Sequence, residues 1–146
     1  MPKHCTINEI TNTFNSVGLG SVTSWLKPYH VLSNGEKMRV NLAYNLLSNT
    51  DLIVFDEFTS VVDRDIAKTT SLAVQKNIRR TNKKFIAISC HFDIINWLMP
   101  DWVYNTDDGS FFSKLTGENQ SLNSKYIKSQ TDLVRKYGKH LANITI

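Results

Sequence analysis

The sequence predicts an α/β fold in which a mostly parallel sheet is flanked by helices. Two short runs, residues 52–55 (LIVF) and 85–89 (FIAIS), are apolar on both faces, which is typical of buried parallel strands. Between them, an apolar stripe at helical spacing extends from Ile66 to Ile78. Strand, helix and strand in this order predict a right-handed βαβ unit.

The other predicted elements lie on either side of this unit. Apolar side chains at helical spacing predict a helix over residues 6–17 and a second helix that begins near Ser33 and ends near Leu47. Residues 101–115 predict two strands joined at an Asp-Asp-Gly turn, which is the strongest hairpin signal in the chain. Strand and helix signals therefore alternate, and no internal repeat interrupts them.

Composition and charge limit the possible classes of protein. The 146 residues are enough for one domain with its own core, and 41% apolar with 21% charged residues is ordinary for a globular protein. No apolar run approaches the roughly 18 residues that a membrane span needs, and no signal peptide is evident, so we expect a cytoplasmic location. The net charge is +4, and its densest basic run, residues 79–84 (RRTNKK), favours a solvated helix end over a nucleic-acid site.

The helix that follows Ser33 begins with three small or polar residues, Ser33, Asn34 and Gly35. Such a start is compatible with an ordinary cap, in which a side-chain oxygen accepts from the free N–H groups of the first turn. It is also compatible with a bound anion, because those N–H groups and the helix dipole favour negative charge. The pattern alone leaves both interpretations open.

Side chains suited to metal binding or acid–base chemistry follow the two predicted parallel strands. Asp56 and Glu57 come directly after the first strand, and His91 follows the second. Any one of them is explained by the return of polar residues at a strand end. Together at neighbouring strand ends, where ligands bind in α/β sheets, they predict a Mg²⁺ site with a second carboxylate that orients a water molecule.

Four segments in order resemble the motifs of ABC-type ATPases. The stretch LSNGEKMR is similar to the signature motif, LIVFDEF to the Walker B strand with its catalytic glutamate, SVVD to the D-loop, and ISCH to the switch histidine. The resemblance covers residues 6–117. It implies a P-loop NTPase-like domain in which two ATP molecules are held between two head-to-tail domains.

The resemblance implies a role for each matching residue. Ser33 and Gly35 would contact the γ-phosphate of the ATP held by the partner domain, and Asp56 would hold Mg²⁺ through water. Glu57 would polarise the attacking water, and His91 would contact the γ-phosphate.

Four further positions complete the predicted site or depart from the family pattern. Asp63 would line the seam between the two domains. Asn34 replaces the first glycine of the signature motif and Glu36 replaces its glutamine, which brings a carboxylate close to the expected phosphate. Phe58 stands where a proline commonly follows the catalytic glutamate.

The sequence contains no G-x-x-x-x-G-K-[ST] segment, so it lacks a Walker A loop and the strands that precede it. We therefore expect residues 1–30 to be a remnant of the helical subdomain, residues 31–117 the C-terminal part of the ATPase core, and residues 118–146 a helical tail. A truncated product, a fragment and one part of a split protein all fit this expectation. The incomplete sheet would expose an edge or an apolar face, to be covered by the tail or by a second copy of the chain.

Two classes of function follow from this organisation. The first is the C-terminal half of an ABC-type ATPase, inactive alone and active when a Walker A-bearing half and a second ABC domain are supplied. The second is a non-catalytic module of ABC shape that binds a protein or a nucleic acid. Retention of Glu57 and His91 favours the first class, whereas the absent Walker A favours the second. Coupling to a membrane subunit, as against a soluble role, is left open.

Overall fold

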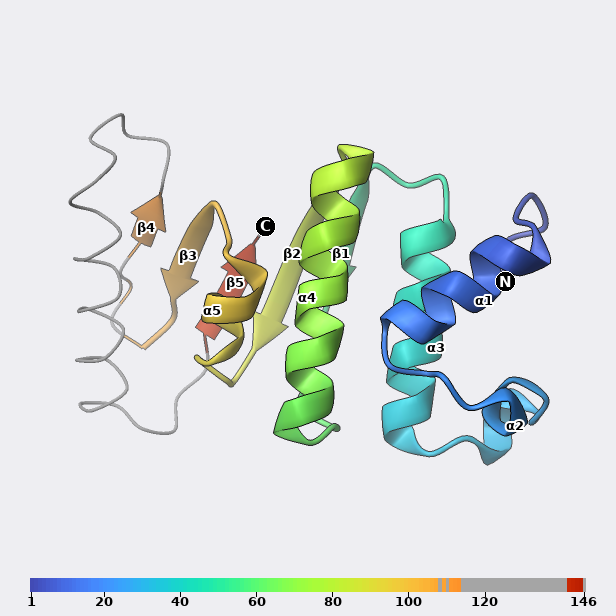
Figure 1. Ribbon diagram of the computed structural model, residues 1–146. Coiled ribbons are helices and arrows are strands. Elements are labelled where there is room, and N and C mark those ends of the chain that lie inside the picture. Colours follow the sequence, from blue (N-terminus) through green and yellow to red (C-terminus); the bar gives the residue numbers. More distant parts are fainter. Residues whose placement is uncertain (108, 110, 114–141, 146) are drawn as a thin grey trace.

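The computed structural model describes residues 1–107, 109, 111–113 and, for their backbone, 142–145. Figure 1 shows its helices and strands in chain order. They are α1 (Ile7–Ser16), α2 (Val22–Trp25), the 3-10 turn η1 (Tyr29–Val31), α3 (Asn34–Leu47), β1 (Leu52–Phe55), α4 (Arg64–Thr81), β2 (Lys84–Ser89), α5 (Ile94–Leu98), β3 (Trp102–Asn105), β4 (Phe111–Ser113) and β5 (Ala142–Thr145).

The predicted βαβ unit is confirmed by the pairing of β1 with β2. These strands are parallel, with Leu52 opposite Lys84 and Phe55 opposite Ala87, and α4 connects them. The predicted helices that begin near residues 6 and 33 and the hairpin of β3 with β4 are also present.

The expectation of a mostly parallel sheet is wrong for the described strands. Their order is β1-β2-β5-β3-β4, and only the β1–β2 pair is parallel. The hairpin makes β3 and β4 antiparallel, and β5 lies antiparallel to both of its neighbours, β2 and β3. The sheet is therefore mixed, because a tight turn and a late strand supply the other pairings.

The expected helical tail is contradicted where the structure describes it, because residues 142–145 form a β-strand. The helical spacing of Leu133, Tyr137 and Leu141 lies outside the described residues. None of the helices within the described ranges is long and apolar enough to cross a lipid bilayer.

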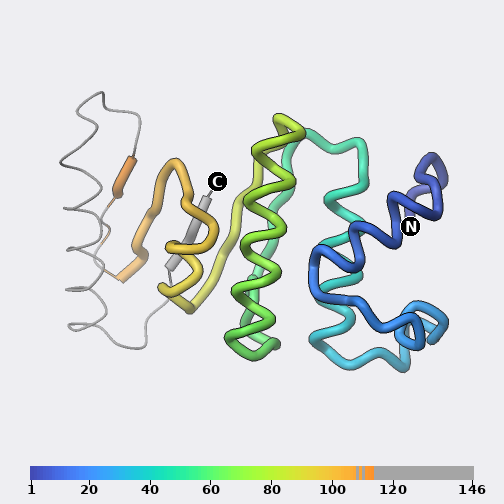
Figure 2. Tube along the Cα trace, in the orientation of Figure 1, coloured from blue at the N-terminus to red at the C-terminus, as the bar shows by residue number. Residues whose placement is uncertain are grey.

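One hydrophobic core lies between the sheet and the helices. Figures 1 and 2 show α4 and α5 on the same face of the sheet, with α3 beside β1 and α1 packed against α3. Leu42 of α3, Val74 of α4 and Phe85 of β2 are completely buried in this core. Phe14 and Val17 from the N-terminal segment join it, so residues 1–30 share packing with the rest of the chain. The division into three domain segments stays a prediction.

Strand β1 differs from its predicted environment. Leu52 and Val54 are 50% and 56% exposed, whereas Ile53 is buried, so burial on both faces is wrong for this chain. Successive side chains of a strand point to opposite faces, and Leu52 and Val54 point to the face opposite the one that Ile53 buries in the core. The strand also lies at one end of the described sheet, with β2 as its neighbour on one side. The prediction that the incomplete sheet exposes an edge or an apolar face is confirmed at β1.

Candidate functional site

The start of α3 is a complete helix cap. Ser33 Oγ accepts from the backbone N–H of Glu36 at 3.2 Å, and the carboxylate of Glu36 accepts from the backbone N–H of Ser33 at 2.8 Å. This reciprocal arrangement satisfies two of the N–H groups that a helix start leaves free. The ordinary cap that the sequence allowed is therefore present.

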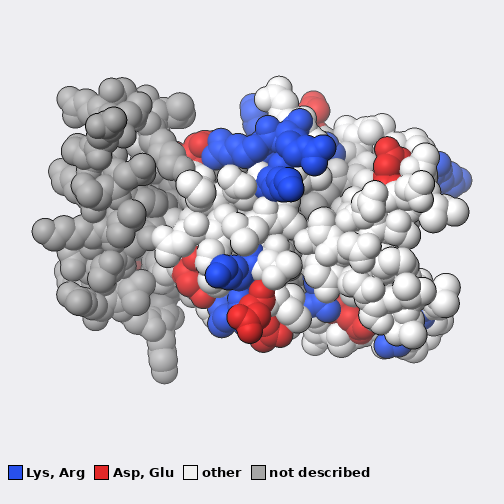
Figure 3. Space-filling view, in the orientation of Figure 1, with Lys and Arg blue, Asp and Glu red and all other residues white. Residues whose placement is uncertain are grey.

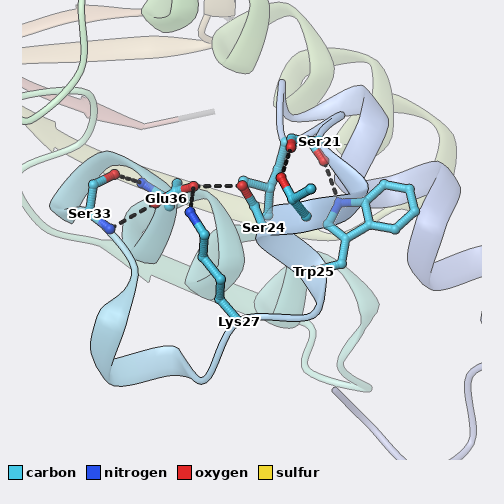
Figure 4. A network of polar contacts seen from close by, with 8 residues as sticks. Ser21, Ser24, Trp25, Lys27, Ser33 and Glu36 are labelled. Carbon is cyan, nitrogen blue, oxygen red and sulfur yellow. Dashed lines mark hydrogen bonds and ion pairs between the residues drawn. The ribbon is translucent and has the colours of Figure 1, made fainter.

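Further polar contacts hold the Glu36 carboxylate, as Figure 4 shows. The hydroxyl of Ser24 donates to it at 2.6 Å, and the ammonium group of Lys27 lies 3.8 Å away. The hydrogen bond from Ser24, followed by those from Ser33, lowers the pKa of Glu36 to about 2. A carboxylate that is ionised at neutral pH thus stands where the resemblance expects phosphate, and this opposes the approach of an anion.

Gly35 is explained by a close approach of two segments. A Cβ atom at this position would lie 3.1 Å from Cγ1 of Val62 and 3.4 Å from the carbonyl oxygen of Val61. The missing side chain therefore lets the loop before α4 pack against the start of α3. The same position lies near Arg39, whose buried guanidinium is attracted to the carboxylates of Glu36 and Asp63.

Asp63 caps the next helix. Its carboxylate accepts from the backbone N–H of Ile66 at 2.9 Å, so it is the N-cap residue of α4. Its side chain is exposed on the same loop that packs against Gly35. The starts of α3 and α4 are thus neighbours in the fold, and a role for Asp63 at a domain seam stays a prediction.

The turn after β1 is strained. Glu57 and Thr59 have φ angles of 50° and 65°. Residues other than glycine and asparagine rarely adopt this left-handed backbone conformation. The backbone N–H of Glu57 donates to Oδ1 of Asp56 at 2.9 Å, and the carbonyl of Glu57 accepts from the N–H of Ser60 at 3.0 Å. Such strain persists only where the surrounding structure imposes it.

Phe58 supplies that constraint. Its side chain is fully buried and packs edge-on against the rings of Phe55 and Phe85. Its backbone N–H donates to the carbonyl of Ile88 at 2.8 Å, and its carbonyl accepts from the hydroxyl of Ser89 at 2.9 Å. A proline at this position could not donate the first of these hydrogen bonds, which gives the departure from the family pattern a structural reason.

A cavity of about 460 Å³ joins the start of α3 to this turn. Asn34 and Lys37 line it from the helix, and Asp56 and Glu57 line it from the end of β1. Both carboxylates are exposed. Among the predicted site residues, the cavity brings together Asn34, Asp56 and Glu57; its lining does not include Ser33, Gly35, Glu36, Asp63 or His91.

His91 is connected to the same turn through Ser89. The hydroxyl of Ser89 accepts from the backbone N–H of His91 at 3.2 Å and donates to Phe58. Burial lowers the pKa of His91 and the positive charge of Arg64 lowers it further, against an opposing effect of Asp93. The neutral imidazole is therefore favoured at physiological pH.

An ion pair that the sequence analysis missed lies beside His91. The guanidinium of Arg64 forms two hydrogen bonds with the carboxylate of Asp93, one of them 2.8 Å long from Nε, and lies over the ring of Trp97. It ties the start of α4 to the turn that carries His91. Arg64 and Asp93 are far apart in sequence, so no local pattern pairs them. The only signals were that Arg64 follows the N-cap of a helix and that Asp93 follows the end of a strand.

The carboxylate oxygens of Asp56 suit Mg²⁺, which prefers oxygen ligands and retains several water molecules. Within the described ranges, no three His, Cys, Asp or Glu side chains form a group that could hold a metal by themselves. Asp56 would therefore supply one carboxylate ligand to such an ion. Glu57 is available beside Asp56 to orient water.

A parallel βαβ unit with carboxylates at its strand end is the arrangement found in nucleotide-binding α/β proteins. A Listeria monocytogenes protein named as an ABC transporter ATP-binding protein is 31% identical over 111 residues, which are 76% of this chain and 40% of that protein. The energy-coupling factor transporter ATP-binding protein EcfA1 of Leuconostoc mesenteroides is 29% identical over 101 residues, 69% of this chain and 36% of that protein.

A third relative, from Vibrio vulnificus and also named as an ABC transporter ATP-binding protein, is 30% identical over 87 residues, 60% of this chain and 15% of that protein. No protein-family model matches the chain, and no solved structure gives a significant match. These similarities support an ABC ATPase domain. The chain spans less than half the length of the curated relatives it matches.

Proposed function

We propose that this chain is the C-terminal half of an ABC-type ATP-binding domain and that it hydrolyses ATP when a Walker A-bearing polypeptide completes the domain. One observation carries the proposal: Asp56 and Glu57 follow β1 of the parallel βαβ unit and line an open cavity at the end of that strand. The similarity to ABC transporter ATP-binding proteins supports it.

Each residue has a task in this proposal. Asp56 holds Mg²⁺, which neutralises phosphate charge when it is bound, and Glu57 takes the proton of the attacking water. The hydroxyl of Ser33 uses its oxygen for the helix cap, so its proton is available for a phosphate oxygen of a nucleotide on a partner domain. His91, with its lowered pKa, accepts or donates a hydrogen bond as a neutral ring.

The experiment combines this chain with the part of the Listeria monocytogenes relative that the chain does not match, prepared as a separate polypeptide. We expect the chain alone to bind Mg-ATP weakly or not at all and the mixture to hydrolyse it. Glu57→Gln should reduce hydrolysis by about 100-fold or more while nucleotide binding is kept. The matched control is Asp65→Asn, which removes an exposed carboxylate from the first turn of α4, outside the cavity.

Two results would contradict parts of the proposal. Near-normal hydrolysis in Glu57→Gln would show that Glu57 is not the general base. Micromolar binding of ATP by the isolated chain, with stoichiometric occupancy, would contradict the need for a second polypeptide. The phosphate role of Ser33 is tested with Ser33→Ala in the same mixture. A substitution at Gly35 is unsuitable, because a side chain there meets Val61 and Val62.

A second candidate function is a non-catalytic module that binds nucleic acid through the basic run of residues 79–84. Figure 3 shows basic side chains gathered on the face that carries α4. However, Arg79 pairs with Asp101 at 2.9 Å and Lys83 donates to the carbonyl of Leu46 at 2.8 Å. Arg80 and Lys84 are exposed. Binding of a duplex DNA probe that is lost in Arg80→Gln with Lys84→Gln would favour this function.

A further inference from the structure

Arg64 occupies a position that local rules disfavour. It is the first residue of α4, directly after the N-cap residue Asp63, and the positive end of the helix dipole favours acidic side chains there. The next residue, Asp65, follows that rule. A basic residue at this position therefore needs a partner elsewhere in the fold, and a broken local rule is expected at functional or strained sites.

Asp93 departs from its own local rule. It stands at the N-cap position of α5, yet its side chain makes no capping hydrogen bond. Its carboxylate instead accepts from Nε of Arg64 at 2.8 Å and from Nη2 of the same side chain. The two residues thus use for each other the charges that neither uses for its own helix.

The geometry of the pair fixes orientation as well as distance. The guanidinium carbon of Arg64 lies 5.5 Å from the centre of the Trp97 ring, so the planar group is held by a two-point bond and by an aromatic face. Figure 1 shows α5 beside α4, with the start of α4 and the turn before α5 at the same end of the sheet. The paired side chains are 39% and 43% exposed, and ion pairs so exposed contribute little to stability.

His91 lies between this pair and a second anchor. On its N-terminal side, its backbone N–H donates to the hydroxyl of Ser89 at 3.2 Å, and that hydroxyl donates to the carbonyl of Phe58 in the strained turn. On its C-terminal side, Asp93 follows two residues later and is held by Arg64. The turn that carries the imidazole is therefore attached at both ends, to the turn after β1 and to the start of α4.

The charges of the pair act on the imidazole with opposite signs. Burial has the largest effect on the pKa of His91 and lowers it, Arg64 lowers it further, and Asp93 raises it. Within the described part of the chain, Arg64 on α4 and Asp93 before α5 are the charged side chains that act on this ring. Removal of one charge therefore moves the pKa in a direction that depends on which partner is changed.

We infer that Arg64 is a positioning residue for His91, because through Asp93 it sets the place of the imidazole in the turn after β2. The inference rests on the proposed function, in which the imidazole makes a hydrogen bond as a neutral ring. It adds to that function a residue that lies outside the four segments that resemble family motifs.

NMR titration of His91 in the chain alone tests the inference without a nucleotide. Arg64→Gln and Asp93→Asn break the pair, and Arg79→Gln is the matched control, because it removes the same charge from a similarly exposed pair with Asp101. We expect the pKa of His91 to rise in Arg64→Gln, to fall in Asp93→Asn and to stay unchanged in Arg79→Gln. In both pair variants, the order parameter of the ring should fall.

Arg64→Lys separates position from charge. It keeps the positive charge but loses the planar fork, so the pKa of His91 should stay close to that of the original chain while the ring becomes more mobile, as in Arg64→Gln. An unchanged ring mobility in Arg64→Lys and Arg64→Gln overturns the inference. Urea denaturation of the same variants checks the fold, and equal stability losses in Arg64→Gln and Arg79→Gln without a change in ring mobility would identify a merely structural pair.

Hydrolysis by the mixture with the unmatched part of the Listeria monocytogenes relative keeps the two proposals distinguishable. We expect Arg64→Gln and Asp93→Asn each to reduce the rate by about tenfold or more, and Arg79→Gln to leave it unchanged. Rates that change in opposite directions would show that charge alone matters, and an undiminished rate in Arg64→Gln overturns the inference while supporting the proposed function. If the original mixture does not hydrolyse ATP, the proposed function is contradicted, and the ring mobility in the chain alone decides whether Arg64 positions His91.

Discussion

The start of α3 and the turn after β1 are both polar segments beside one cavity, yet they are built differently. At the start of α3, the carboxylate of Glu36 has hydrogen bonds from Ser24 and Ser33, and the backbone has no positive φ angle. In the turn, Glu57 and Thr59 adopt left-handed conformations. The carboxylate of Glu57 is exposed.

The difference separates a segment whose polar groups stabilise the fold from one whose backbone is strained beside exposed carboxylates. A helix cap with satisfied groups lowers the free energy of the folded chain. Left-handed residues raise it, and the burial of Phe58 compensates. We therefore expect substitutions that break the α3 cap to lower stability, whereas removal of the strain at Glu57 should raise stability and, under the proposed function, abolish activity.

The largest expected effect is that of Phe58→Ala. It removes a fully buried ring from the aromatic contacts with Phe55 and Phe85, so the free energy of unfolding should fall by about 3–5 kcal/mol. Urea denaturation followed by circular dichroism measures the change. Phe111→Ala, at a side chain that is 60% exposed and contacts the ring of Trp102, is the control and should lower stability much less. Equal losses in both variants would show that Phe58 does not anchor the turn.

An intermediate effect of opposite sign is expected for Glu57→Gly. Glycine adopts a φ angle of 50° without steric cost, so the variant relieves the strain at this position. Glycine also has more conformational freedom in the unfolded chain, which offsets part of the gain. The free energy of unfolding should therefore rise by about 1 kcal/mol. Asn82→Gly is the matched control, because Asn82 has a similar φ of 55° but asparagine tolerates it, and the gain should be smaller. Thermal denaturation of the two variants compares them. A loss of stability in Glu57→Gly would contradict the strain assigned to the turn.

The smallest expected effect is the pH dependence that Glu36 confers. Its pKa is about 2 in the folded chain against an ordinary value of 4.5, so the ionised carboxylate stabilises the fold fully above about pH 4.5. That contribution is lost as the pH falls from about 4.5 to about 2. The stability difference between the original chain and Glu36→Gln should therefore shrink over this window in denaturation curves. A difference that is constant from pH 6 to pH 2.5 would mean that the charge of Glu36 contributes nothing.

Local patterns in the sequence predicted the elements that depend on neighbouring residues. The alternation of an apolar strand, an amphipathic helix and a second apolar strand was sufficient for the parallel β1–β2 pair. The Asp-Asp-Gly turn was sufficient for the β3–β4 hairpin, in which Gly109 has a φ of 69°. The cap at Ser33 could be predicted because its hydrogen bonds join residues only three positions apart.

Contacts between distant residues were not predictable in this way. The approach of Gly35 to Val61 and Val62 and the pairing of Arg64 with Asp93 both depend on the packing of α3 and α4 in the complete fold. The position of β5 between β2 and β3 is set by the pairing of three strands. The phosphate and metal roles of the site residues stay predictions, because they depend on molecules other than this chain.

The sheet can be completed only after β5 has been synthesised, because β5 lies between β2 and β3. Thr145 lies opposite both Ile86 in β2 and Trp102 in β3, so β5 supplies the backbone pairing between the β1–β2 and β3–β4 halves of the described sheet. A ribosome synthesises β5 after all of its partners, and contacts between residues far apart in sequence form slowly. A nascent chain that has not yet reached Ala142 therefore exposes the facing edges of β2 and β3, and during synthesis these edges are the expected binding sites for chaperones.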